Sequence, residues 1–310
     1  MTYGAVIPIK DIGETSRRAI SQFLQETQVA NRFPARSLPS PVESKVREVF
    51  QSWGLDIPKE KYENRLVAAI QFACWAYEHV SYDFQVAMSL FTVCVLILDD
   101  DLIATQTLRE FVPRFCTGEP QGAPILDRLI EAVRGLCAFF PDYSANATYA
   151  SILTYANEEL WLNTDAKNLV LRSGSKKYVD FSRNKGGLPE PYAFGIWPKS
   201  ICADTTEYIQ AVPEANTFIN GVNDIFSFYK ESLAGEANNY IHQYAQAHEK
   251  TLEDAIDDLV RNTISSVEKV RDILGEGKAK DAWERFISGY TCYHLYCPRY
   301  RLNEVVPEYF

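Results

Sequence analysis

The sequence lacks the features that are typical of disulfide-bonded, zinc-binding or nucleic-acid-binding proteins. Its seven cysteines are scattered and include no CxxC pair, which argues against a disulfide framework and against a zinc knuckle. The net charge is -10, and no stretch is rich in lysine or arginine. We therefore expect no nucleic-acid partner. If the ligand is an anion, metal ions and a few local basic residues must bind it.

Signals for secretion and for a membrane are also missing. The first residues contain no charged segment followed by a long apolar run, so they do not predict a signal peptide. The longest apolar run, 86–98, has 13 residues and includes Ser89 and Thr92, whereas a membrane-spanning helix needs about 20. We expect a cytoplasmic protein without stable membrane insertion.

What the sequence does contain is apolar residues at helical spacing along most of its length. Hydrophobic residues make up 46% of the chain and aromatic residues 13%, enough for a sizeable core. Proline and glycine cluster near residues 40, 120 and 190, and none of these clusters resembles a flexible linker. The pattern predicts one large all-α domain, 41–310, after a partly irregular N-terminal arm, 1–40. The helices that we expect cover 63–80, 81–98, 147–163, 251–274 and 280–297.

One expected helix carries polar residues at every fourth position in the stretch NDIFSFYKE. Asn223, Ser227 and Glu231 lie roughly on one face of such a helix. Their amide oxygen, hydroxyl and carboxylate are hard ligands of the kind that Mg²⁺ prefers. Lys230 lies close to the same line and is placed to hold an anion that the metal also contacts. A solvated helix face gives the same spacing, so the pattern alone leaves both interpretations open.

A second polar cluster, LILDDDLIA, places three aspartates, 99–101, directly after an apolar helix. Carboxylates are unfavourable at the negative end of a helix dipole, and adjacent carboxylates repel one another, so such a cluster favours a bound cation. Capping of the next segment is the alternative interpretation. Together, the two clusters predict Mg²⁺ ions between them. Because Mg²⁺ is commonly shared with substrate phosphates, they also predict a phosphorylated substrate with an apolar end.

With these motifs the chain resembles class I terpene synthases, in particular fungal sesquiterpene cyclases of the trichodiene synthase type. The resemblance extends in order from about residue 65 to residue 304, and includes WPK at 197–199 and HLYCPRYRL near the C-terminus. It implies a single class I terpenoid synthase α-domain, a helical bundle around a deep apolar cavity. It also implies an isoprenoid diphosphate as substrate and a homodimer.

The resemblance implies that four residues bind metal. Asp99 would bridge two Mg²⁺ ions. A third ion would be chelated by Asn223, Ser227 and Glu231, and Mn²⁺ is the alternative metal.

The resemblance also implies a clamp for the diphosphate group. Arg183 lies 40 residues before Asn223, where the family has its diphosphate-sensing arginine. Lys230, Arg299 and Tyr300 would complete the clamp.

A helix break is implied just after Arg183. Gly186 and Gly187 occupy the positions where the family breaks a helix and directs a backbone carbonyl at the departing diphosphate. We expect glycine there because it tolerates unusual backbone angles.

The aspartate cluster departs from the family pattern at one position. The family has another acid four residues after its first aspartate, and here that residue is Ile103. We keep Asp99 as the ligand, expect Asp100 to support it, and expect Asp101 to face away because it lies about 200° round the helix from Asp99.

Residues one turn from these motifs, or on facing helices, are candidates to line the apolar cavity, where aromatic faces stabilise a cation by about 0.5–2 kcal/mol each. Core packing is the commoner fate of any one of them. The four histidines have no ligand spacing, and we expect none to be catalytic. The candidates are Phe72, Trp75, Phe91, Thr92, Leu96, Trp161, Ile219, Asn220, Tyr290 and Tyr293.

The expected activity is that of a Mg²⁺-dependent sesquiterpene cyclase, a carbon–oxygen lyase that releases diphosphate. Farnesyl diphosphate would ionise to an allylic cation, which then folds into a cyclic hydrocarbon or alcohol. A chain-elongating prenyltransferase is one alternative, although that class uses a second aspartate-rich motif where this chain has the Asn/Ser/Glu motif. A non-catalytic isoprenoid-binding protein is the other. The sequence does not decide between C10, C15 and C20 substrates.

Overall fold

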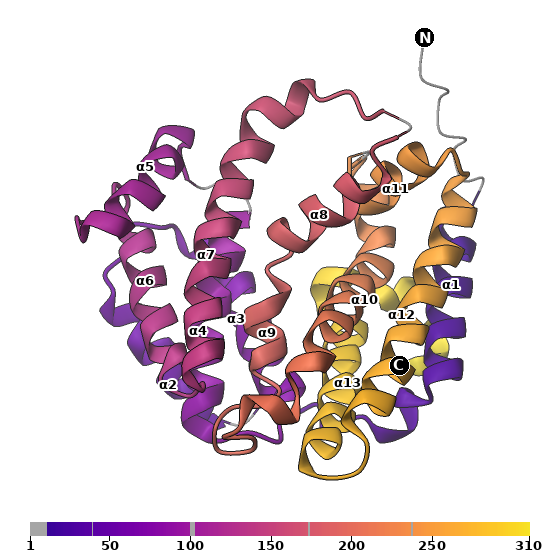
Figure 1. Ribbon diagram of the computed structural model, residues 1–310, viewed down its shortest axis with the longest axis horizontal. Coiled ribbons are helices and arrows are strands. Elements are labelled where there is room, and N and C mark those ends of the chain that lie inside the picture. Colours follow the sequence, from indigo (N-terminus) through magenta and orange to yellow (C-terminus); the bar gives the residue numbers. More distant parts are fainter. Residues whose placement is uncertain (1–10, 39, 100–102, 173, 237) are drawn as a thin grey trace.

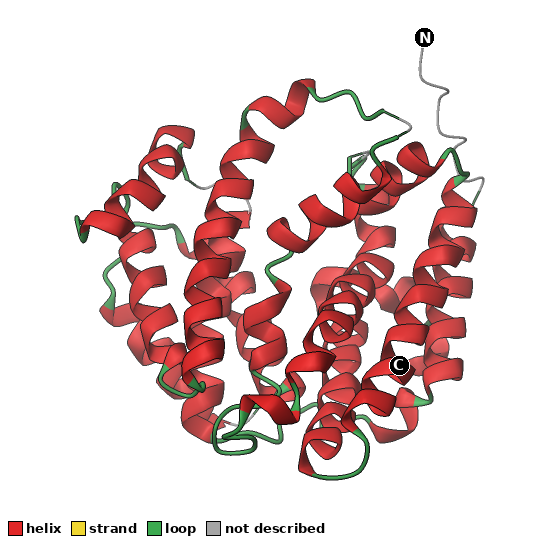
Figure 2. Ribbon diagram, in the orientation of Figure 1, coloured by secondary structure: helices red, strands yellow, loops and turns green. Residues whose placement is uncertain are grey.

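The computed structural model describes residues 11–38, 40–99, 103–172, 174–236 and 238–310. Asp100 and Asp101, for which we expect different roles, lie outside these residues. In the described part the chain forms α-helices and short 3-10 helices and no β-strand (Figure 2), which confirms the all-α prediction. The α-helices are α1 Ile12–Thr27, α2 Ser40–Ser52, α3 Lys59–Ala76, α4 Tyr82–Asp99, α5 Thr105–Thr117, α6 Pro124–Cys137, α7 Asp142–Asn163, α8 Lys176–Gly186, α9 Pro189–Phe194, α10 Val212–Leu233, α11 Tyr240–His248, α12 Leu252–Leu274 and α13 Lys278–Tyr296.

The five helices expected from apolar spacing correspond to α3, α4, α7, α12 and α13, with ends that differ by a few residues. The NDIFSFYKE stretch lies in the second half of α10, so its polar residues do share one continuous helix. Helical periodicity therefore located every long helix that it was applied to.

The helices pack side by side in one bundle (Figure 1). α3 packs against α4 and α13, while α10 packs against α9 and α12, and α7 against α5 and α9. Two of these contacts depend on glycine, because a Cβ atom on Gly289 would overlap the backbone carbonyl of Trp75 and one on Gly221 would overlap Thr263. The close approach of α13 to α3, and of α10 to α12, fixes the relative positions of the helices that carry the candidate site.

The segment predicted as an N-terminal arm packs on the bundle over its described part. Asp11 caps α1 by accepting a hydrogen bond from the Glu14 amide at 2.9 Å. Ile20 and Phe23 are fully buried, and the Phe23 ring contacts the Phe226 ring of α10 edge-on at 5.8 Å. A boundary at residue 40 therefore does not separate this segment from the helical core.

α4 is longer than the 13-residue apolar run that it contains. It has 18 residues and a mean hydropathy of 1.5, and in the described part it is the one helix whose length and composition suffice for a membrane span. However, 61% of it is buried in the bundle, where it packs against α2, α3 and α6. A buried core helix can have the same length and hydropathy as a membrane-spanning helix. Burial in the bundle therefore accounts for the apolar composition of α4.

Candidate active site

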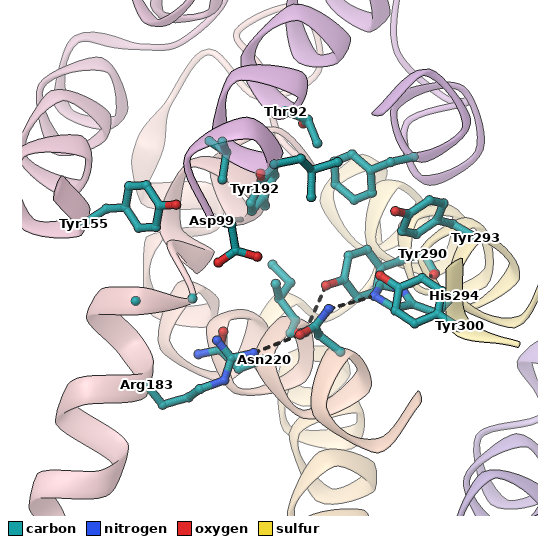
Figure 3. Close-up of a pocket in the computed structure, with 17 residues that line it drawn as sticks. Thr92, Asp99, Tyr155, Arg183, Tyr192, Asn220, Tyr290, Tyr293, His294 and Tyr300 are labelled. Atoms are coloured by element: carbon teal, nitrogen blue, oxygen red, sulfur yellow. Dashed lines mark hydrogen bonds between the residues drawn. The ribbon is translucent and has the colours of Figure 1, made fainter. Parts of the chain in front are cut away.

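Two adjoining cavities share part of their walls. The inner cavity has a volume of about 150 Å³ and mainly aromatic and aliphatic walls from α3, α4, α7, α9, α10 and α13 (Figure 3). The outer cavity, of about 700 Å³, has mainly polar and charged walls. The inner cavity therefore suits an apolar chain, and the outer one suits a charged group joined to it. The residues that line both are Asp99, Arg183, Gly186, Gly187 and Asn223.

Most of the residues predicted to line an apolar cavity do line the inner one. The structure also adds lining residues that we did not predict. Those predicted are Phe72, Thr92, Leu96, Ile219, Asn220, Tyr290 and Tyr293, and those added are Val95, Tyr155, Tyr192 and His294.

Three predicted lining residues do not belong to the wall of the inner cavity, and each packs elsewhere. Phe91 is fully buried 5.6 Å from the Tyr192 ring. Trp75 is buried where α3 meets α13, with its carbonyl against Gly289. The Trp161 indole donates a hydrogen bond to the Tyr178 hydroxyl at 2.9 Å, towards α8. Helical spacing placed these residues near the site but did not decide which face they occupy.

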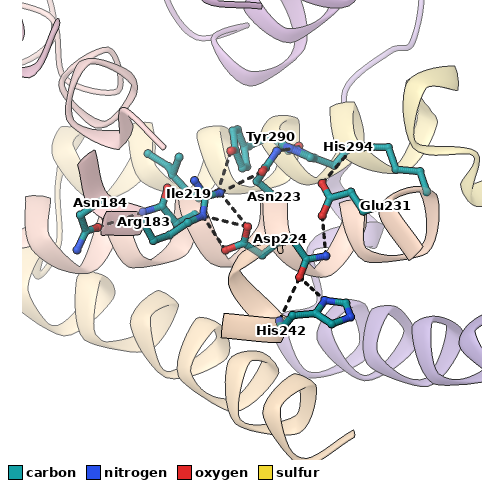
Figure 4. A network of polar contacts seen from close by, with 12 residues as sticks. Arg183, Asn184, Ile219, Asn223, Asp224, Glu231, His242, Tyr290 and His294 are labelled. Atoms are coloured by element: carbon teal, nitrogen blue, oxygen red, sulfur yellow. Dashed lines mark hydrogen bonds and ion pairs between the residues drawn. The ribbon is translucent and has the colours of Figure 1, made fainter. Parts of the chain in front are cut away.

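Arg183 is held in place at the boundary between the two cavities. Its Nε donates to both carboxylate oxygens of Asp224, at 3.0 and 2.9 Å, and its Nη2 donates to Asn223 Oδ1 at 3.1 Å (Figure 4). The side chains of Arg183 and Asp224 are 19% and 12% exposed, so the ion pair is shielded from water. A guanidinium held from one side by a planar carboxylate is oriented before any ligand binds.

The electrostatics of this pair follow from its burial. Burial lowers the pKa of Arg183, but attraction and hydrogen bonding to Asp224, together with smaller effects of Tyr290 and Glu231, outweigh burial and raise the pKa. Burial raises the pKa of Asp224 to about 6, although Arg183 opposes the shift. We did not predict Asp224, because its role depends on the position of α8 beside α10.

Two of the three predicted ligands on α10, Asn223 and Glu231, line the outer cavity. Glu231 accepts a hydrogen bond from Lys230 Nζ at 3.0 Å and another from Asn239 Nδ2 at 3.1 Å. Ser227, one turn before Glu231, is buried and lines neither cavity. Helix α10 therefore presents these amide and carboxylate oxygens to the outer cavity with Ser227 between them.

Asp99, the last residue of α4, also lines the outer cavity. Its carboxylate points into the space between α4 and the Arg183 side chain (Figure 3). The described part of the chain brings no three His, Cys, Asp or Glu side chains together, so a metal would depend on mixed oxygen ligands from two helices. Carboxylate, amide and hydroxyl oxygens fit Mg²⁺, which needs few protein ligands when a substrate phosphate supplies others.

The other predicted clamp residues gather near the same cavities. Lys230 and Arg299 line the outer cavity, and Tyr300 lines the inner one. The Tyr300 ring lies 5.8 Å from the Tyr293 ring and 6.0 Å from Lys230 Nζ. The structure thus brings the predicted clamp together from α8, α10 and the 3-10 helix η5, Pro298–Tyr300.

The predicted helix break is present, but glycine is needed for a different reason. α8 ends at Gly186, and Gly187 has an ordinary φ of -77°, so the explanation from unusual backbone angles is wrong. Leu188, with φ 49°, takes the left-handed conformation instead. A Cβ atom on Gly187 would overlap Arg183 Nη1 and the Asn220 amide oxygen. Gly187 therefore makes room for the Arg183 side chain.

Ile103, the position of the missing acid, lies away from both cavities. It packs against the core and lines a separate groove with Ile97 and Ile125. An isoleucine fits these apolar surroundings. A carboxylate at position 103 would enter this groove and not the outer cavity.

Of two residues that we missed, His294 had a signal in the sequence and Tyr192 had none. His294 lies one turn after Tyr290, which we predicted to line the cavity, and α13 presents both on one face. Tyr192 belongs to the six-residue helix α9, inside the proline- and glycine-rich stretch near residue 190, where we expected no helix. His294 could have been found from its spacing, whereas Tyr192 could not.

The chain is similar to known terpene synthases in sequence and in fold. The family model for trichodiene synthase (TRI5) matches residues 55–309. The chain is 34% identical over 290 residues to monoterpene synthase 25 of Postia placenta, which covers 93% of this chain and 86% of that protein. It is 32% identical over 300 residues to terpene synthase 29 of the same fungus, covering 96% and 86%.

Among solved structures, the chain is similar to linalool/nerolidol synthase from Streptomyces clavuligerus in complex with 2-fluorogeranyl diphosphate. The TM-score is 0.60 at 17% sequence identity, and the match covers 86% of this chain and 97% of that chain. At this identity the similarity supports the fold alone.

Proposed function

Because the chain belongs to the trichodiene synthase family, and is thus a class I terpene synthase that acts as a lyase, we propose that it is a Mg²⁺-dependent sesquiterpene cyclase. Its substrate would be farnesyl diphosphate, and its product a cyclic hydrocarbon or alcohol. One observation carries the proposal: a polar outer cavity, with oxygen ligands on two helices and a held arginine, shares a wall with an aromatic inner cavity.

The outer cavity would bind the diphosphate group. Asp99, Asn223 and Glu231 line this cavity and would hold Mg²⁺, which would supply Lewis-acid stabilisation of the leaving group when it is bound. Ser227, predicted as a ligand with them, lies between Asn223 and Glu231 on α10 but lines neither cavity. Arg183 has its Nη1 group on the side of Gly187, and a guanidinium binds two phosphate oxygens in a planar fork. Lys230 and Arg299 add positive charge. The carbon–oxygen bond breaks heterolytically, and its electron pair leaves with the diphosphate oxygen.

The inner cavity would shape the carbocation. Phe72 lies at the centre of an aromatic group, with ring centroids 5.1 Å from Tyr192, 5.8 Å from Tyr290 and 5.3 Å from Tyr293. Their faces stabilise positive charge by about 0.5–2 kcal/mol each. The buried walls also limit the access of water, which would otherwise capture the cation before it cyclises.

A second candidate is a monoterpene synthase that acts on geranyl diphosphate. Two observations favour it: the inner cavity is only about 150 Å³, and one relative at 34% identity is named a monoterpene synthase. By contrast, a prenyltransferase is disfavoured because α10 carries the Asn/Ser/Glu motif where that class has a second aspartate-rich motif.

The decisive experiment is incubation of the purified protein with geranyl, farnesyl and geranylgeranyl diphosphates and Mg²⁺, followed by analysis of volatile products. We expect a cyclic C15 product and the highest kcat/KM with farnesyl diphosphate. Higher kcat/KM with geranyl diphosphate would support the second candidate. Condensation with added isopentenyl diphosphate would indicate chain elongation. No turnover of any substrate with Mg²⁺ or Mn²⁺ would reject the cyclase.

A homodimer and a cytoplasmic location remain predictions. Light scattering coupled to size-exclusion chromatography measures the mass of the particle, and a dimer of the 35.3 kDa chain would elute with twice that mass. A monomer at micromolar concentration would contradict the expected dimer.

A further inference from the structure

His294 lies on α13 and contacts Asn223 on the facing side of α10. Its side chain is buried and lines the inner cavity next to Asn223. The rings of Tyr290, Tyr293 and Tyr300 lie 4.4, 4.9 and 4.8 Å from the imidazole ring. Packing on several sides leaves the imidazole little freedom to turn, so the direction of its two nitrogens is set by the fold.

The contacts of the ring identify its tautomer. Nδ1 lies 2.9 Å from the backbone carbonyl oxygen of Tyr290. Because a carbonyl oxygen only accepts hydrogen bonds, Nδ1 carries the proton and Nε2 presents a lone pair when the ring is neutral.

This tautomer in turn determines how the Asn223 amide is oriented. Nε2 of His294 lies 3.4 Å from the Asn223 Nδ2 group, which donates to it. On the other side, Asn223 Oδ1 accepts from Arg183 Nη2 at 3.1 Å. A flipped amide would place its oxygen against the Nε2 lone pair and its NH₂ group against the guanidinium. Both partners therefore select the same orientation (Figure 4).

We propose that His294 is a positioning residue that keeps the Asn223 amide oxygen turned towards the outer cavity, where it would bind Mg²⁺. This inference rests on the proposed metal-dependent function. A carbonyl oxygen has two lone pairs, so Oδ1 accepts from Arg183 and still offers one to the cation. His294 would not touch the metal. Loss of a group that orients a metal ligand typically weakens metal affinity about 10–100-fold.

The test measures Mg²⁺ binding without turnover. Thermal unfolding is followed across a Mg²⁺ titration in the presence of inorganic diphosphate, and the Mg²⁺ concentration for half-maximal stabilisation is compared between variants. His294→Phe keeps a ring but removes the Nε2 acceptor. We expect it to raise that concentration about 10-fold or more. His294→Gln restores a polar partner at this position, and we expect it to recover most of the affinity.

His79 provides a matched control. It is also a mostly buried histidine whose ring contacts a backbone carbonyl, that of Ile196 at 3.2 Å, but it lines neither cavity. His79→Phe should change the melting temperature of the free protein without changing the Mg²⁺ titration. If His294→Phe does not fold, His294→Met removes the acceptor with a flexible apolar side chain and is interpreted in the same way.

A double-mutant cycle isolates the orienting role. Asn223→Asp has an oxygen at both ends of its side-chain group, so its ligand atom does not depend on orientation. His294→Phe should therefore cost much less in the Asn223→Asp background than in wild type. An unchanged Mg²⁺ titration of His294→Phe, or an equal cost in both backgrounds, would overturn the inference. If Mg²⁺ and diphosphate do not stabilise the wild-type protein, the proposed metal site itself is wrong.

Discussion

The outer and inner cavities are built by different means. In the outer cavity the polar side chains are already joined to one another: Arg183 to Asp224 and Asn223, and Glu231 to Lys230. In the inner cavity the walls are aromatic rings in contact with each other, and the amide oxygen of Asn220 has no hydrogen-bond partner among the described residues. The outer walls are organised mainly by hydrogen bonds and the inner walls mainly by ring packing, although Tyr290 of the inner wall also donates to the Ile219 carbonyl at 2.9 Å.

Under the proposed function, the diphosphate would ionise in the outer cavity and the cation would fold in the inner one. Groups that stabilise a developing charge act best when they are fixed in advance, which is what hydrogen bonding provides in the outer cavity. A wall of packed rings fixes shape, which determines how a flexible cation folds. Changes in the outer cavity should therefore alter the rate, and changes in the inner cavity should alter the product.

The largest expected effect is at Asp99. Asp99→Asn removes the charge that would offset two cations, and we expect turnover to fall by about 1,000-fold, the upper range for one preorganised group. Steady-state kinetics across a Mg²⁺ titration measures the loss. Asp101→Asn serves as the comparison, because helical geometry predicts that it faces away. An inactive Asp101→Asn protein beside an active Asp99→Asn protein would reverse the choice of ligand.

A smaller effect is expected at Gly187. A Cβ atom there would overlap Arg183 Nη1, so Gly187→Ala should displace the guanidinium and lower kcat/KM about 10–100-fold. Gly186→Ala is the matched control, because its Cβ atom would make ordinary contacts of 3.6 Å with Glu158 and 3.7 Å with Leu162. Equal activity of the two variants would show that Gly187 does not set the position of Arg183.

In the inner cavity, Tyr192→Leu should change the product rather than the rate. The Tyr192 ring contacts Phe72 and lines the cavity, so its removal enlarges the space in which the cation folds. We expect a new mixture of volatile products and less than about a 10-fold loss in turnover, since one ring face contributes about 0.5–2 kcal/mol. Trp161→Phe should leave the mixture unchanged, because Trp161 faces Tyr178. A changed product mixture with Trp161→Phe would show that Trp161 does line the cavity.

The smallest effect on activity is expected at Ile103. Ile103→Asp restores the acid of the family pattern, but the side chain would enter the groove beside Ile97 and Ile125. We expect no gain in turnover and a loss of about 1–3 kcal/mol in the free energy of unfolding, because a carboxyl group would be partly buried without a partner. Urea unfolding measures that loss. Faster turnover with unchanged stability would mean that position 103 reaches the metal.

The sequence predicted the outer cavity better than the inner one, for a physical reason. Its ligands lie at fixed spacing on one helix, and the 3.6-residue period alone places Asn223 and Glu231 together. The inner wall depends on how separate helices are rotated. Trp161 and Phe91 lie on helices that border the site, yet neither lines it. Asp224 was missed because its partner is on α8, which only tertiary packing brings near.

The central claim is that the α10 face binds the metal that activates the diphosphate. It is tested most directly by the Mg²⁺-dependent release of inorganic diphosphate from farnesyl diphosphate by the wild-type, Glu231→Ala and Glu236→Ala proteins. Glu236 also lines the outer cavity but lies beyond the end of α10. We predict that Glu231→Ala is at least about 100-fold slower with an unchanged circular dichroism spectrum, while Glu236→Ala resembles wild type. Near-normal release by Glu231→Ala would contradict the account.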